Sequence, residues 1–306
     1  MTAFARWVMK GRMQAVIAAT VLAVLALLVT PLALLSAAVI VLTVLRQGWR
    51  EGALVVASGL LALGGLGGLL FQMPLAVALI GVMLWLPAAV LGAVLGRSGS
   101  LRIAIEAAVI IAAAVVLVQY AMLQDPAAFW GEVLNEFVVQ RLDAETLSAS
   151  NIGQLIGLMS AWMAGGVAAT WLLGSVISLC LARYWAASID RPGAFGDEFR
   201  RLRFGRWLLW LLPLLLLAGV LATGGEPNML SQLYLVGMVV FLVQGLSVAH
   251  GLVKEFGGSP AWLVGLYLLL FLVAPQGATA VAAAGYLDGW VDFRARARAR
   301  RSNTGD

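Results

Sequence analysis

Long apolar runs recur along nearly the whole chain and constrain its fold more than any other feature. Residues 109–118 and 208–217, for example, are apolar throughout and show no alternation with polar residues. Inside a bilayer the backbone finds no water, so only helices and closed barrels can span it. Barrel strands alternate apolar and polar residues, so these runs indicate helices. We therefore expect an all-α, polytopic transmembrane helical bundle.

The composition supports a membrane protein and argues against a soluble one. Of the 306 residues, 62% are hydrophobic and only 11% are charged, whereas soluble domains contain about 25% charged residues. The net charge of +5 lies mostly in short segments beside the apolar runs. Such segments set topology and contact the lipid bilayer, so we do not expect nucleic acid as a partner.

About ten crossings are expected, each requiring roughly 20 residues or somewhat fewer. In chain order the apolar segments are 13–29, 32–45, 53–70, 75–95, 103–123, 152–181, 207–222, 230–253 and two arms within 261–286. Pro31 disfavours helical geometry at the preceding residue, so the first two segments form a short hairpin. The break at 275–277 allows either a second hairpin or one irregular span. The positive-inside rule favours the hairpin, because it leaves the arginine-rich tail in the cytoplasm.

The predicted topology places both termini in the cytoplasm, with a single transmembrane domain at 13–290. Residues 1–12 form a basic N-terminus, 183–206 a basic cytoplasmic loop and 291–306 a basic tail. Residues 124–151 form an external acidic segment. Apolar residues at three- and four-residue spacing within it predict one amphipathic helix on the membrane surface.

No catalytic motif is recognisable, and the chain is expected not to be an enzyme. It lacks a phosphate-binding Gly-x-x-x-x-Gly-Lys-Ser/Thr loop and a His-Glu-x-x-His zinc motif. With one histidine and one cysteine, we predict no catalytic residues, metal site or cofactor. ATP hydrolysis, if the protein needs it, must come from another chain.

Neutral polar residues gather near the predicted external ends of three spans. They are Gln119, Tyr120, Asn151, Gln154, Gln232 and Tyr234. Together they could line a pocket for a small ligand, covered by the acidic surface helix. The alternative is that they form interhelical hydrogen bonds and interfacial anchors, which is also our interpretation of Gln244 in the middle of a span.

Two further sets of residues are candidates for docking a partner. Ala15, Ala19 and Ala23 recur at four-residue spacing on the first apolar helix, where small residues permit close helix packing. Asp288 and Asp292 are expected to lie one helical turn apart at the inner interface, followed by Arg294. We expect Asp292 to pair with Arg296 at i,i+4.

Residues 285–294, Gly-Tyr-Leu-Asp-Gly-Trp-Val-Asp-Phe-Arg, resemble the Gly-x-x-Asp-x-Trp-x-Asp-Phe-Arg signature of the YybS-like family of bacterial inner-membrane proteins. The opening segment, with Pro31 and the later Arg46-Gln47-Gly48, resembles the same family. This resemblance implies kinship with the substrate-binding (S) components of energy-coupling-factor transporters and with the cell-shape protein MreD. It implies an S-component-like core in which the alanine face meets a membrane coupling subunit. The extra spans and the acidic helix depart from a compact six-helix S component.

Two functions remain open from the sequence. The first is a small-molecule binding and uptake subunit that relies on a coupling subunit and separate ATPases. The alternative is a structural or scaffolding protein of the cell envelope, similar to MreD, with other envelope proteins as partners.

Overall fold

The computed structural model describes residues 2–139 and 149–303, and throughout these ranges the regular elements are α-helices. In chain order they are α1 (Thr2–Val8), α2 (Arg12–Ala26), α3 (Leu32–Gln47), α4 (Trp49–Phe71), α5 (Pro74–Ser98), α6 (Leu101–Met122), α7 (Pro126–Val139), α8 (Ala149–Asp190), α9 (Ala194–Arg200), α10 (Arg206–Thr223), α11 (Met229–Glu255), α12 (Ala261–Leu272), α13 (Ala274–Val291) and α14 (Phe293–Asn303). The all-helical fold class is confirmed.

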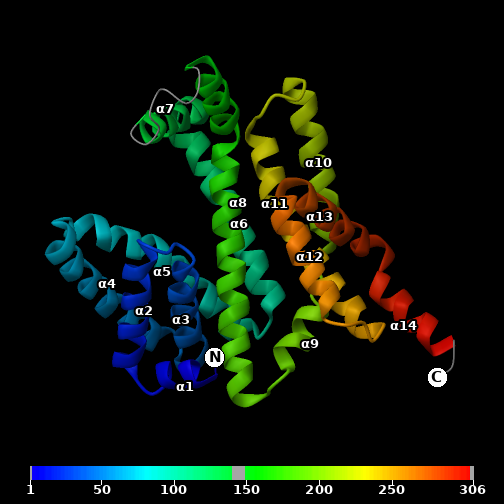
Figure 1. The fold of residues 1–306 in the computed structure, drawn as a ribbon, viewed down its shortest axis with the longest axis horizontal. Coiled ribbons are helices and arrows are strands. Elements are labelled where there is room, and N and C mark those ends of the chain that lie inside the picture. The colour runs from blue at the N-terminus through cyan, green and yellow to red at the C-terminus, as the bar shows by residue number, and fades with distance from the viewer. Residues whose placement is uncertain (1, 140–148, 304–306) are drawn as a thin grey trace. The chain divides into compact units, whose positions relative to one another are not determined.

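The chain divides into two compact units, where a single domain was expected. Unit 1 comprises Met1–Ala108 and Leu173–Leu202, and unit 2 comprises Val109–Leu172 and Arg203–Asp306. Helices α6 and α8 each contribute to both units, and α8 is the long green helix in Figure 1.

Unit 1 is built around the packing of α2, α3, α4 and α5. Helices α2 and α3 form the hairpin expected around Pro31 and lie side by side (Figure 1). At the centre, the fully buried Trp85 donates its indole N–H to Ser36 Oγ at 2.8 Å, and Ser36 in turn donates to the carbonyl of Ala19 at 2.8 Å. A Cβ at Gly59 would lie 2.7 Å from the Trp85 ring. This glycine therefore lets α4 approach the tryptophan.

Unit 2 is centred on α11, which packs against α10, α12, α13 and α14. The turn before α11 is fixed by Asn228, whose side chain accepts the backbone N–H groups of Leu230 and Ser231. Ser231 completes a capping box by accepting from the N–H of Asn228 at 2.8 Å. Helices α10 and α11 thus form a tight antiparallel pair.

Within residues 2–139 and 149–303, six helices are long and apolar enough to cross a membrane: α4, α5, α6, α8, α10 and α11. A seventh candidate combines α1 and α2, which are bent by 119° relative to each other. Helices α3 and α12 are apolar but shorter, with 16 and 12 residues. At 1.5 Å per residue, α12 extends roughly 18 Å, well short of the 30 Å hydrocarbon core. The helices expected at all ten apolar segments are present, but length and composition support six or seven spans.

Three segments differ from the expected boundaries. The 183–206 segment, expected as a loop, is helical to Asp190 and again in α9. The N-terminal segment 1–12 contains α1, and the basic tail forms α14. The expected amphipathic helix is found as α7, with Phe129, Val133 and Phe137 exposed, while residues 140–148 of the acidic segment lie outside the described residues.

Candidate functional site

The predicted polar cluster of unit 2 forms in part, and its members bond to other helices. Gln119 on α6 donates to the carbonyl of Ala164 on α8 at 3.2 Å. Its side-chain oxygen accepts the indole N–H of Trp130 at 2.9 Å, which ties α7 to α6. Both ends of the Gln119 amide are therefore occupied by interhelical contacts.

Gln232 on α11 makes the most specific of these contacts. Its amide donates to the carbonyl of Ala161 and accepts the N–H of Gly165, both at 2.7 Å. Ala161 and Gly165 are four residues apart on α8, so both polar atoms of the buried Gln232 side-chain amide bond to the backbone of the same helical turn. A Cβ at Gly165 would overlap with Gln232, so the glycine is required for this approach.

Of the other predicted ligand-binding residues, Tyr120 lies beside Gln119 and Gln232. Gln154 is exposed and Tyr234 is half-buried, and the side chain of Asn151 lies outside the described residues. The structure thus brings together Gln119, Tyr120 and Gln232 from the predicted set; Trp130 joins them. Their ligand-binding role stays a prediction.

The alanine face of α2 points into unit 1. Ala15 and Ala19 are completely buried, and Ala23 is half-buried. Helix α2 packs against α3 and α4, so the small residues serve contacts within the unit. Docking of a partner through this face stays a prediction.

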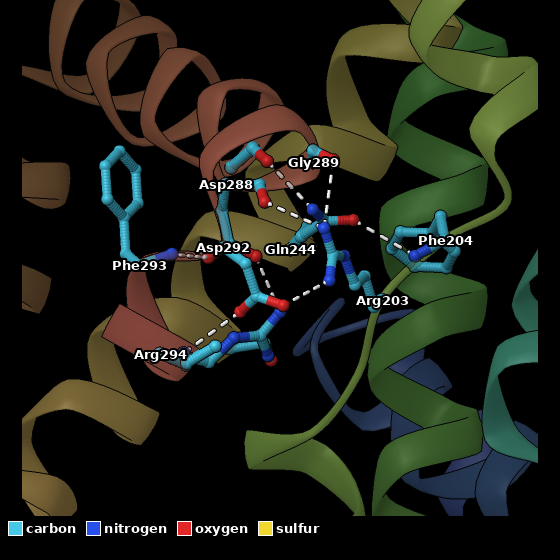
Figure 2. A network of polar contacts seen from close by, with 11 residues as sticks. Arg203, Phe204, Gln244, Asp288, Gly289, Asp292, Phe293 and Arg294 are labelled. Atoms are coloured by element: carbon cyan, nitrogen blue, oxygen red, sulfur yellow. Dashed lines mark hydrogen bonds and ion pairs between the residues drawn. The ribbon is translucent and has the colours of Figure 1, made fainter. Parts of the chain in front are cut away.

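The second candidate site is the junction between α13 and α14 (Figure 2). Helix α13 ends at Val291, and Asp292 adopts a left-handed conformation with φ of 53° before α14 begins. Asp288 accepts the N–H of Phe293 at 3.0 Å, and Asp292 accepts the N–H of Ala295 at 3.1 Å. The two carboxylates cap the N-terminus of α14, where backbone N–H groups lack helical partners and favour negative charge.

Two arginines complete this junction. Arg294 Nη2 lies 2.7 Å from Asp288 Oδ2, and Arg294 Nη1 donates to Ser247 Oγ on α11 at 3.0 Å. Arg203, which precedes α10, lies 2.5 Å from Asp292 Oδ2 and donates to the carbonyl of Gly289 at 2.9 Å. As Figure 2 shows, Arg203 reaches the end of α13. The junction therefore holds two ion pairs, Asp288 with Arg294 and Asp292 with Arg203.

Gln244 on α11 extends the network into the helix bundle. Its amide donates to the carbonyl of Gly285 at 2.9 Å and accepts the N–H of Phe204 at 3.1 Å. This confirms the interhelical hydrogen bond expected for Gln244. Adjacent to it, a Cβ at Gly245 or Gly285 would overlap with the backbone of the facing helix, so α11 and α13 are in backbone contact.

The ionisation of Asp292 is set by opposing influences. Burial raises its pKa, but the N–H of Ala295 and the positive charge of Arg203 lower it by more, so the net pKa lies below its ordinary value. Asp292 therefore remains charged at neutral pH.

The docking residues predicted at this end occupy different environments. Asp288 and Arg294 are buried against each other, whereas Asp292 is about one-third exposed. The expected Asp292–Arg296 pair is wrong: Asp292 contacts Arg203, which is 89 residues away. The helix breaks at Asp292, so the i,i+4 relationship on which that expectation depended does not apply. Docking of a partner here stays a prediction.

Unit 1 contains a polar cavity that the sequence did not indicate. Its volume is about 470 Å³, and it is lined by residues of α8, α9 and the link between them, including Arg183, Arg191 and Glu198. Arg183 lies 2.7 Å from Glu198, whose other oxygen accepts the N–H of Leu101 at 3.0 Å. Because the segment was expected to be a loop, no spacing argument could bring these residues together.

Comparison with known proteins supports the membrane assignment. In the described parts of the chain, no three His, Cys, Asp or Glu side chains are close enough to hold a metal ion. No curated protein matches the chain, and no solved structure does. Residues 139–289, just under half of the chain, match a family model described as a predicted membrane protein, DUF2232. The chain is thus similar to a family of predicted membrane proteins over a segment that ends within α13.

Proposed function

We propose that this chain is a non-enzymatic protein of the bacterial inner membrane with a structural or scaffolding role in the cell envelope. Its helices and its similarity to a membrane-protein family support the membrane location. Its likeness to the YybS-like family, and through it to MreD, supports the envelope role.

The observation that carries this proposal is how unit 2 uses its polar side chains. Gln119, Gln232 and Gln244 each bridge backbone groups or side chains of other helices with both ends of the amide. Gly245 and Gly285 lock α11 to α13 by backbone contact. Such a bundle suits a rigid platform, since movement of these helices would leave polar groups unsatisfied in an apolar medium.

We further propose the ten-crossing topology with both termini in the cytoplasm. The positive-inside rule supports it, because the basic segments alternate in sequence with the uncharged or acidic turns.

In a Cys180→Ala background, a cysteine at Glu226 in the turn after α10 should react with a membrane-impermeant maleimide in intact cells. A cysteine at Ser302 should react only after permeabilisation. Labelling of Ser302→Cys from outside would overturn this topology.

Deletion of the gene in its native host tests the scaffolding role. The expected result is altered cell shape or division without a nutrient requirement, and tagged protein purified in mild detergent should recover envelope proteins. Normal morphology combined with a growth defect relieved by one nutrient would contradict the proposal.

Small-molecule uptake is the second candidate, favoured by the convergence of Gln119, Tyr120 and Gln232 beside Trp130 of α7. It requires a membrane coupling subunit and ATPases to co-purify with the chain. It also requires a bound small molecule in native mass spectra that is lost in Gln119→Leu. If the ATPases and the ligand are both absent, uptake is excluded and the scaffolding role retained.

A further inference from the structure

Cationic side chains from three distant segments meet at one end of unit 2. Arg206 begins α10, Lys254 lies one residue before the end of α11, and Arg296 and Arg298 lie on α14. All four are exposed. We call these four residues the basic collar.

Contacts within unit 2 place the members of the collar together. The Arg203–Asp292 ion pair brings the start of α10 to the end of α13, and Arg206 follows three residues after Arg203. Arg298 lies 3.7 Å from Glu255 at the end of α11. Trp210 on α10 packs edge-on against Trp290 on α13, with ring centroids 4.8 Å apart. The three helix ends therefore share one region of the unit.

Two members of the collar, Arg206 and Arg296, carry positive charge that no described acidic side chain neutralises. Arg203 and Arg294 are occupied by Asp292 and Asp288. Among the described residues, neither Arg206 nor Arg296 has an ion-pair or side-chain hydrogen-bond partner, and both are exposed. Arg300 and Arg301 follow in the sequence and add to the positive charge of α14. The site is therefore complementary to an anionic surface.

Exposed tryptophans beside the collar indicate that its anionic partner is a membrane surface. Trp207, Trp210 and Trp290 are exposed at the same end of the unit, and tryptophan is enriched at the level of lipid headgroups. Arg296 lies six residues beyond Trp290, on the helix that follows the break at Asp292. Acidic proteins and nucleic acids would not require this aromatic belt.

We propose that the basic collar binds the headgroups of anionic phospholipids. The buried Asp288–Arg294 pair and the two carboxylate caps fix the direction of α14, so Arg296 and Arg298 are presented on an ordered helix beside the bilayer. Each cation near an anionic membrane surface should contribute about a fivefold gain in affinity. The inference depends on the membrane location but not on the scaffolding role.

The test measures lipid retention by the full-length protein in detergent, using native mass spectrometry at increasing phosphatidylglycerol or phosphatidylcholine. Arg206→Gln/Arg296→Gln/Arg298→Gln should weaken phosphatidylglycerol binding by about a hundredfold and leave phosphatidylcholine binding unchanged. The same positions changed to lysine should retain binding. Raising the salt concentration should weaken phosphatidylglycerol binding of the wild type but have little effect on the glutamine variant.

A matched control uses three exposed arginines of unit 1, changed as Arg50→Gln/Arg97→Gln/Arg191→Gln. This variant has the same loss of charge and should retain most of the phosphatidylglycerol affinity. Equal loss in both variants would show a general charge effect and overturn the proposal, as would unchanged binding in the collar variant. An unchanged unfolding temperature in both variants verifies that any loss is not due to misfolding. A normal deletion phenotype would instead contradict the scaffolding role and leave the lipid site intact.

Discussion

Asp288 and Arg294 form an ion pair inside unit 2, with Oδ2 and Nη2 separated by 2.7 Å. The Asp288 side chain is completely buried and that of Arg294 is 6% exposed. The other oxygen of Asp288 accepts the N–H of Phe293, and the other nitrogen of Arg294 donates to Ser247. The pair therefore joins α11, α13 and α14.

Removing one partner of this pair should be strongly destabilising. Arg294→Met leaves the Asp288 carboxylate buried without its cation, and loss of one partner of a buried pair costs about 3–5 kcal/mol. Asp288→Leu/Arg294→Met replaces both charges and should be closer to wild type than either single variant. Thermal unfolding of the purified protein in detergent measures the order of stability. A double variant less stable than both single variants would contradict this account.

The pH dependence of stability should include a contribution from Asp292. Its pKa in the folded protein is lowered by the N–H of Ala295 and by Arg203, against the raising effect of burial. A lowered folded pKa gives stability that is fully present above the unfolded value of about 3.9 and is lost as the pH falls through the folded pKa.

The Asp292→Asn variant tests this contribution, because asparagine tolerates the positive φ at this position. The difference in unfolding temperature between wild type and variant should be greatest at neutral pH and should shrink below about pH 4. Because the carboxylate is about one-third exposed, the difference should be modest. A difference that stays constant from pH 7 to pH 3 would contradict the assignment.

The sequence predicts the helices well because their determinants are local. Continuous apolar residues define the segments, and proline marks the breaks: α2 ends before Pro31, and α13 begins one residue before Pro275. Arg102 and Glu106, four residues apart on one face of α6, form an ion pair at 2.9 Å. Elements and contacts within about one helical turn are therefore accessible from sequence.

Contacts between distant segments are not accessible in the same way. Nothing near Arg203 in the sequence indicates that it caps α13, and only the break at Asp292 makes that contact possible. The alanine spacing on α2 shows that a helix can pack closely, but not whether its neighbour belongs to the same chain. Gln119 and Gln232 were found because they lie near span ends, yet both bond to backbone groups of α8, which no residue type reveals.

The Gln232 bridge should be worth about 1–2 kcal/mol, the upper range for interhelical hydrogen bonds in membranes. Gln232→Met keeps a similar volume and removes both bonds, so the unfolding temperature should fall moderately. Gln154→Met, at an exposed position on α8, is the matched control and should have little effect. Equal unfolding temperatures for the two variants would show that the bridge does not stabilise the bundle.

The backbone contact between α11 and α13 makes the sharpest steric prediction. In an ordinary exposed helix, Gly→Ala stabilises by roughly 0.5–1 kcal/mol, and Gly265 on α12, which has no atom near its Cβ position, should behave in this way. At Gly245 or Gly285 the added methyl group would overlap with the carbonyl oxygen of Val281 or Phe241, respectively. Backbone atoms cannot rotate away, so the two helices would have to separate, which would also stretch the bond from Gln244 to Gly285. We expect each alanine variant to lower the unfolding temperature of the purified protein well below that of Gly265→Ala, and stabilisation at all three positions would show that α11 and α13 are not in contact.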